Sequence, residues 1–147
     1  MTSIIRETGI ATTPEAAWDA FRDFGALHEL AAGFVTSTKL EDDRTRVVTF
    51  FNGATAREAL IGIDGQARRI AWTITDLAGA AHHSGSAQIL PDGEDPSRCR
   101  FIWITDVLPD DLAERLDAMM DAGLAAMKRT LESARAGQEK PAPHAGR

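Results

Sequence analysis

The sequence predicts an α+β fold in which a bent antiparallel sheet of seven strands wraps around a long C-terminal helix, with two short helices covering one end. Three observations predict it. A strand pattern precedes two short helical patterns, strand periodicity with turn signals then runs from residue 33 to residue 107, and one long amphipathic stripe follows. Because one sheet and one long helix cannot enclose a core while the sheet stays flat, the sheet must curl around the helix.

The N-terminal segment predicts one strand followed by two short helices. Residues 3–11 are rich in isoleucine and other strand-forming side chains. Thr13 is placed to cap the first helix, and Pro14 suits its first position. Aromatic residues at every third position then give one apolar face, and Gly25 should end this helix before a second short one at 27–30.

Six further strands are separated by turn residues. Asn52–Gly53 and Asp64–Gly65 are pairs that tolerate the positive φ of two-residue hairpin loops, and a longer turn is expected at 91–96. Consecutive strands should therefore pair antiparallel, as a meander. The strands are expected at residues 34–40, 44–51, 54–64, 68–76, 82–90 and 98–107.

The last element is a helix of about six turns after Pro109, because its apolar residues recur at helical spacing and charged residues occupy the other angles. That face should pack on the sheet. Residues 137–147 contain two prolines and no periodic apolar residue, so we expect one folded domain at 1–136 and a disordered tail. The stripe comprises Leu112, Leu116, Met119, Met120, Gly123, Met127 and Leu131.

Composition excludes several functions. The formal charge of -6 should repel a phosphate backbone, so no nucleic-acid partner is expected. Cys99 is the single cysteine, and no secretory signal or membrane span is present, which favours the cytoplasm. No zinc-site spacing, nucleotide-binding loop or hydrolase motif occurs, so we predict neither metal nor cofactor. The protein is expected to be a monomer or a homodimer.

Four features carry a family resemblance: the Asn52–Gly53 hairpin, the Arg57-Glu58-x-Leu60 strand, the Trp72 strand, and the Trp103 strand leading into the final helix. Over nearly residues 1–135 the chain resembles the polyketide cyclase/dehydrase-like branch of the SRPBCC (START-like) superfamily. The resemblance implies a helix-grip fold with a deep hydrophobic cavity. Members of that branch bind or transport lipids, hormones and polyketides, and a minority catalyse cyclisation or dehydration.

Strand alternation selects the side chains that should face such a cavity. In the last strand Phe101 and Trp103 share the apolar parity, and in strand 68–76 Trp72 and Ile74 do. The two tryptophans would then form an aromatic wall, although ordinary core packing explains them too. The ligand-binding residues we predict are Phe34, Glu58, Leu60, Trp72, Ile74, His83, Phe101, Trp103, Met119, Met120, Gly123 and Met127.

Glu58 and His83 are the candidate catalytic residues. His83 falls on the less polar parity of its strand, and His82 on the other. Arg57 and Glu58 must face opposite sides of the sheet, and we favour Glu58 on the concave side, where burial would raise its pKa. A structural histidine and a cross-strand salt bridge are the competing interpretations.

The predicted function is therefore binding of a small hydrophobic or aromatic molecule, such as a lipid or polyketide-like compound, between the sheet and the C-terminal helix. One alternative is an enzyme of the polyketide cyclase or dehydratase type that uses acid or base groups in the cavity. Another is a protein-interaction or chaperone-cofactor module, which would require an exposed apolar patch.

Overall fold

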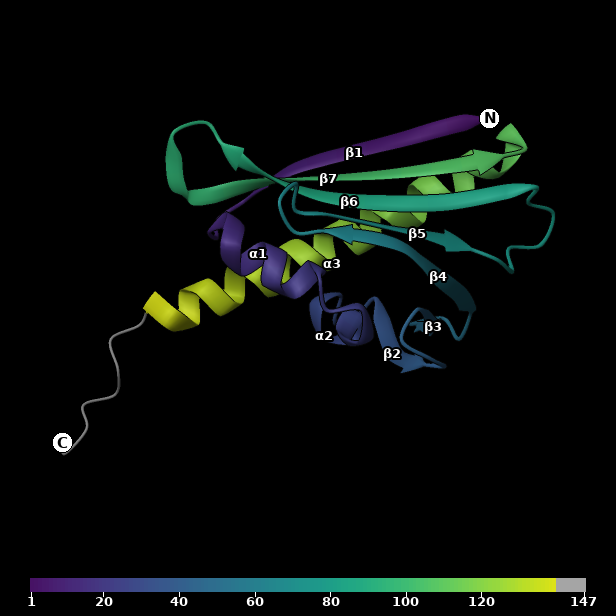
Figure 1. Cartoon of the computed structure of the whole chain (residues 1–147), viewed down its shortest axis with the longest axis horizontal. Helices are drawn as coiled ribbons and strands as arrows, with labels where there is room; N and C mark the ends of the chain where they lie inside the picture. Colours follow the sequence, from purple (N-terminus) through teal and green to yellow (C-terminus); the bar gives the residue numbers. More distant parts are fainter. Residues whose placement is uncertain (140–147) are drawn as a thin grey trace.

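The computed structural model describes residues 1–139 and confirms the predicted fold class: one antiparallel sheet of seven strands in the order β1-β7-β6-β5-β4-β3-β2, with a long C-terminal helix (Figure 1). The strands are β1 Thr2–Ile10, β2 Val35–Leu40, β3 Thr45–Phe50, β4 Thr55–Asp64, β5 Arg69–Ile74, β6 His82–Asp92 and β7 Asp95–Leu108. The helices are α1 Pro14–Phe21, α2 Leu27–Leu30 and α3 Ala113–Glu139, with short 3-10 segments η1 Phe24–Ala26 and η2 Asp110–Leu112.

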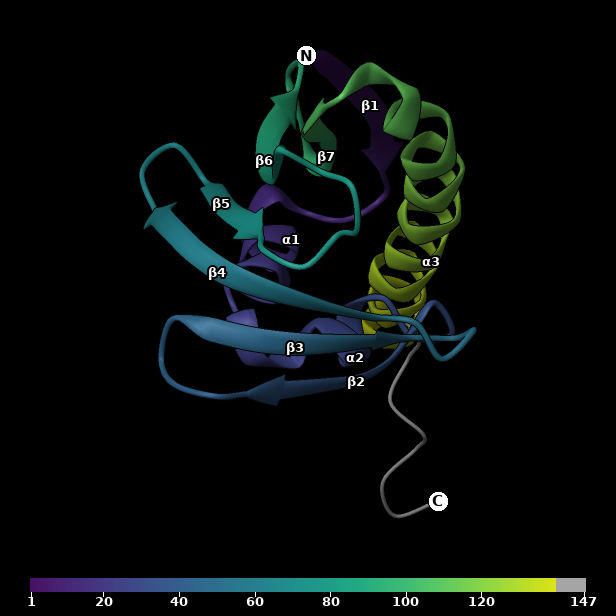
Figure 2. The same cartoon turned by 90° about the vertical axis from the view of Figure 1, so that its right-hand side faces the viewer.

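The sheet is strongly curved, and α3 crosses its open side. Seen end on, the strands describe an arc from β1 to β2, with α3 alongside and with α1 and α2 toward one end (Figure 2). This is the grip that the sequence predicts, and it leaves a concave surface facing the helix.

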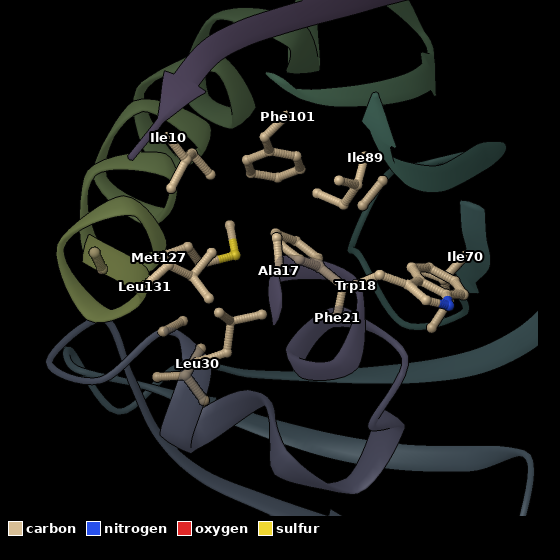
Figure 3. Close-up of a cluster of buried hydrophobic side chains, with 14 of the residues drawn as sticks. Ile10, Ala17, Trp18, Phe21, Leu30, Ile70, Ile89, Phe101, Met127 and Leu131 are labelled. Carbon is tan, nitrogen blue, oxygen red and sulfur yellow. The ribbon is translucent and has the colours of Figure 1, made fainter. Parts of the chain in front are cut away.

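Helix α1 closes one end of the concave surface. Thr13 caps it, because its Oγ1 accepts a hydrogen bond from the backbone N–H of Ala16 at 3.2 Å, and Pro14 occupies the first turn. The buried face of α1 points between α3 and the sheet (Figure 3). There Phe21 packs on Phe101 of β7, with ring centroids 4.5 Å apart. This packing fixes α1 as the end wall of the interior.

Helix α3 is held against β1 as well as against the core. Its buried residues include Leu116, Met120 and Met127. On the outer side, Arg6 of β1 donates from Nε to Asp117 at 2.7 Å, and Lys128 Nζ donates to the carbonyl of Gly9 at 2.7 Å. These contacts tie both halves of α3 to the edge strand, so the helix position is well defined.

Several strand bounds differ from the predicted ones by up to three residues, and three differences affect a helix or a turn. The first helix ends at Phe21, and Phe24 begins a 3-10 turn instead of continuing the helix. The predicted turn at 91–96 is a tighter hairpin, since β6 runs to Asp92 and Gly93 takes a φ of 56°. Helix α3 includes residues 137–139, which the sequence pattern assigns wrongly to the tail, whereas residues 140–147 lie outside the described part of the chain.

A cavity between the sheet and the C-terminal helix

A cavity of about 480 Å³ lies between the concave face of the sheet, α1, α2 and α3. Its wall is mainly apolar and aromatic, which is typical of a small-molecule site. The exposed residues Asn52, Asp76 and Arg115 belong to the lining, and we refer to them as the cavity mouth. The lining includes these predicted residues: Phe34, Glu58, Trp72, Ile74, His83, Phe101, Trp103, Met119, Met120 and Met127.

Two predicted ligand-binding residues, Leu60 and Gly123, are not among the lining residues. Leu60 packs as a half-buried side chain against the main hydrophobic cluster, so it supports the wall from outside the cavity. Gly123 of α3 has no side chain to present. A β-carbon there would lie 3.0 Å from Phe34 and 3.1 Å from Trp103, so the glycine allows those two rings to approach the helix.

Trp72 and Trp103, the two tryptophans of the predicted aromatic wall, both line the cavity, each beside other neighbours. Phe101 and Trp103 stack with ring centroids 6.3 Å apart and planes 15° apart. Trp72 lies over Gly85 of β6, because a β-carbon at residue 85 would come within 2.8 Å of the indole. Residue 85 is therefore a glycine for a packing reason, because the Trp72 ring occupies the space that a side chain would need.

Glu58 faces the interior and is paired with Arg46, a residue that our sequence analysis missed. The register of β3 and β4 places the two residues opposite each other, and they are 6% and 4% exposed. Arg46 Nε donates to Glu58 Oε1 at 2.8 Å, and Nη2 lies 2.7 Å from the same oxygen. Burial raises the pKa of Glu58, and the charge and hydrogen bonds of Arg46 oppose that shift.

Arg46 is also bound on its other sides. Its Nη1 donates to the carbonyl oxygen of Phe24 at 2.9 Å, and its guanidinium lies 4.1 Å from the centre of the Phe24 ring and 5.7 Å from that of Trp72. The alternation of β3, in which Val48 is also fully buried, was the available signal for an inward Arg46. Arg57 points outward and pairs with Glu41 at 3.1 Å, which decides the choice between Arg57 and Glu58.

His83 lines the cavity and His82 is exposed, as alternation predicts. Burial lowers the pKa of His83 to about 4, with a smaller contribution from His82 in the same direction and an opposing one from Asp76. His83 is therefore uncharged at neutral pH. Within residues 1–139 its Nδ1 is buried and has no hydrogen-bond partner, and the same is true of the Trp103 indole nitrogen.

Two features are absent from the part of the chain that the structure describes. No three His, Cys, Asp or Glu side chains are grouped so that they would hold a metal ion. None of the described helices is both long enough and apolar enough to cross a membrane.

Comparison with known proteins gives one family and a set of similar folds. The model of a family described as polyketide cyclase / dehydrase and lipid transport matches residues 1–132. XoxI from Bacillus cereus has a TM-score of 0.79 at 19% identity, over 89% of this chain and 96% of that one. Norcoclaurine synthase from Thalictrum flavum, solved with dopamine and hydroxybenzaldehyde, has a TM-score of 0.70 at 17% identity, over 95% of this chain and 89% of its own. These likenesses show the fold.

A curated relative matches over a shorter segment. A type III pantothenate kinase from Burkholderia vietnamiensis is 35% identical over 82 residues, which cover 52% of this chain. The match spans only 31% of the kinase.

Proposed function

The chain belongs to the polyketide cyclase / dehydrase and lipid transport family, and from that premise we propose that it binds a small apolar or aromatic molecule in the cavity between the sheet and α3. The observation that carries the proposal is the cavity itself. Its volume of about 480 Å³ lies within the usual range for small-molecule pockets, and its wall is lined by Phe34, Trp72, Phe101 and Trp103.

The aromatic lining supports an aromatic ligand class. Flat rings pack well against the faces and edges of indole and phenyl groups. A protein of the same fold, norcoclaurine synthase, was solved with two aromatic molecules, dopamine and hydroxybenzaldehyde. The three methionines of the lining, Met119, Met120 and Met127, are flexible and polarisable, which suits a wall that adapts to ligands of different shape.

Tryptophan fluorescence tests the proposal directly. The chain has three tryptophans and no tyrosine, and Trp72 and Trp103 line the cavity. We expect naphthalene-sized aromatic compounds to change this emission in a saturable way, and native mass spectrometry to detect a small molecule that co-purifies from the host. The proposal would be contradicted if no aromatic probe and no co-purifying compound showed saturable binding.

A pair of matched variants shows whether binding occurs in the cavity. Ala56 lies in the cavity wall on β4, so Ala56→Phe should fill part of the cavity and weaken binding. Ala118 lies on the exposed face of α3, so Ala118→Phe adds the same side chain elsewhere and should leave binding unchanged. Equal affinities in the two variants would place the ligand outside the cavity.

The enzymatic alternative stays a prediction, because the site geometry favours binding. With a pKa of about 4, His83 is a weak base at neutral pH, and Glu58 is bound to Arg46. We therefore propose no reaction. If turnover of any bound compound is found, His83→Gln and Glu58→Gln are the variants that should abolish it. The interaction-module alternative, the cytoplasmic location and the oligomeric state also stay predictions.

A further inference from the structure

The buried pair of Arg46 and Glu58 uses only one oxygen of the carboxylate. Both contacts from the guanidinium fall on Oε1, at 2.8 and 2.7 Å. Within residues 1–139, no group donates a hydrogen bond to Oε2. Glu58 belongs to the cavity lining although it is only 6% exposed. Its second oxygen is therefore a hydrogen-bond acceptor without a donor in the described part of the chain, on a residue that lines the cavity.

The positive partner of the pair is not open to a ligand in the same way. Each nitrogen of the Arg46 guanidinium already has an acceptor, because Nε and Nη2 contact Glu58 and Nη1 donates to the Phe24 carbonyl. The rings of Phe24 and Trp72 cover its faces. A ligand carboxylate would have to displace one of these contacts in a buried environment, which is costly.

The remaining charged groups of the lining do not favour an anion. His83 is neutral, and Asp76 at the cavity mouth is acidic and exposed. Asp23, also in the lining, is acidic, and Arg115 is an exposed cation at the mouth. With Arg46 neutralised by Glu58, the lining carries more acidic than basic charge, and the whole chain has a formal charge of -6.

The surroundings of Glu58 define how a ligand would approach it. Ile74 of β5 is directly opposite Glu58 in the sheet, and both residues line the cavity with Trp72. A molecule that contacts the carboxylate must therefore lay its apolar body along Ile74 and the Trp72 ring. Polar and apolar contacts are adjacent, which is the arrangement that a compact aromatic alcohol or phenol satisfies.

We propose that the cavity selects apolar ligands that carry a hydrogen-bond donor, namely a phenol, an alcohol or an ammonium group, and discriminates against free carboxylates, with Glu58 Oε2 as the acceptor. The inference rests on the proposed binding function and deepens it by naming the ligand class. It excludes free fatty acids and aromatic acids as preferred ligands, and it makes Glu58 a specificity-determining residue.

A matched series of three compounds tests the inference: naphthalene, 2-naphthol and 2-naphthoate, measured by tryptophan fluorescence and calorimetry at neutral pH. Because a hydrogen bond to a charged group has a substantial net value, we expect 2-naphthol to bind about tenfold tighter than naphthalene. We expect 2-naphthoate to bind more weakly than naphthalene, since its carboxylate would face Glu58.

Variants assign the preference to Glu58. Glu58→Gln should reduce the preference for 2-naphthol and improve binding of 2-naphthoate. Glu94 is exposed in the turn between β6 and β7 and does not line the cavity, so Glu94→Gln makes the same substitution elsewhere and should preserve the order of the three compounds. If Glu58→Gln does not fold, the double variant Arg46→Met with Glu58→Leu removes both charges, and naphthalene and 2-naphthol should then bind equally.

The outcomes separate this inference from the proposed function. If none of the three compounds binds, the inference fails, and the proposed function fails with it when no co-purifying compound binds either. If they bind and 2-naphthoate equals or exceeds 2-naphthol, binding stands and the selectivity for donors is refuted. The same conclusion follows if the order of affinities is unchanged in Glu58→Gln, or if the control Glu94→Gln abolishes it.

Discussion

Removing one member of the buried ion pair should cost much more stability than removing both. Arg46 and Glu58 are 4% and 6% exposed, so either residue alone would be a charge without its partner in a mostly apolar wall. Three variants are compared with the original protein: Arg46→Leu, Glu58→Leu, and the two substitutions together. Leucine is chosen because it keeps an apolar side chain at each position.

The two single substitutions should each cost about 3–5 kcal/mol, as expected when a buried pair is broken. They should differ in pH dependence. In Arg46→Leu the remaining carboxyl can take up a proton, so the cost should shrink as pH falls toward 4.5, the ordinary pKa of a glutamate. In Glu58→Leu the remaining guanidinium stays charged, so the cost should be independent of pH in this range. The double variant should lie within about 2 kcal/mol of the original protein, because apolar replacement of a buried pair is often nearly neutral.

Urea unfolding followed by tryptophan fluorescence measures all four proteins, at neutral pH and near pH 5. The free energy of unfolding gives the coupling between the two residues, which should be at least about 4 kcal/mol if the single and double costs are as expected. Costs below about 1 kcal/mol for both single variants, or costs that simply add in the double variant, would refute the reasoning. Either result would mean that water in the cavity screens the pair.

Three other predictions concern the packing, the histidine and the cysteine. Gly85→Ala should destabilise the protein by about 1–3 kcal/mol and shift the near-UV circular dichroism, because its β-carbon would overlap the Trp72 ring. Gly62→Ala is the control and should be nearly neutral, because a β-carbon there would have no atom within 4 Å. Equal effects of the two substitutions would contradict this prediction. The folded-state pKa of His83 is about 4 against an ordinary 6.5, so the unfolded state binds the proton first as pH falls, and the stability that the neutral histidine confers above pH 6.5 is lost between pH 6.5 and 4. His83→Gln should remove that part of the pH dependence of stability in urea titrations. Glu58 contributes a pH dependence of the opposite sign because its pKa is raised, but this contribution is present in both proteins. If the difference in stability between the two proteins does not change with pH, the slope does not come from His83. Cys99 is buried and its thiol pKa is raised to about 11, so a thiol reagent should label it only at the rate of unfolding; rapid labelling of the folded protein would show that β7 opens locally.

The fold was predictable because each element has a local pattern of its own. The helix stripe that includes Leu116 and Met127 and the alternation around Trp72 and Trp103 depend only on neighbouring residues. Curvature then follows from the need to bury both surfaces at once. The same alternation correctly placed His83 inward and His82 outward, because a strand offers only two faces.

The ion pair was not predictable, because it depends on the exact register of one hairpin. A two-residue loop at Asn52–Gly53 would place Arg46 opposite Ala59. The observed ladder pairs Thr49 with Thr55, and this shift of one position brings Arg46 opposite Glu58. The geometry of the loop between β3 and β4 sets this register, and the sequence pattern alone does not distinguish the observed wider loop from a two-residue loop.

The pairing of the first strand with the last has a consequence for how the protein folds. Thr2 lies opposite Val107 and Ile10 opposite Cys99, so β1 finds its place only after a loop of roughly ninety residues or more has closed. Such distant pairing belongs to slow-folding topologies, and until α3 docks on β1 the concave surface is open to water. The order of assembly therefore makes the cavity one of the last parts of the molecule to form.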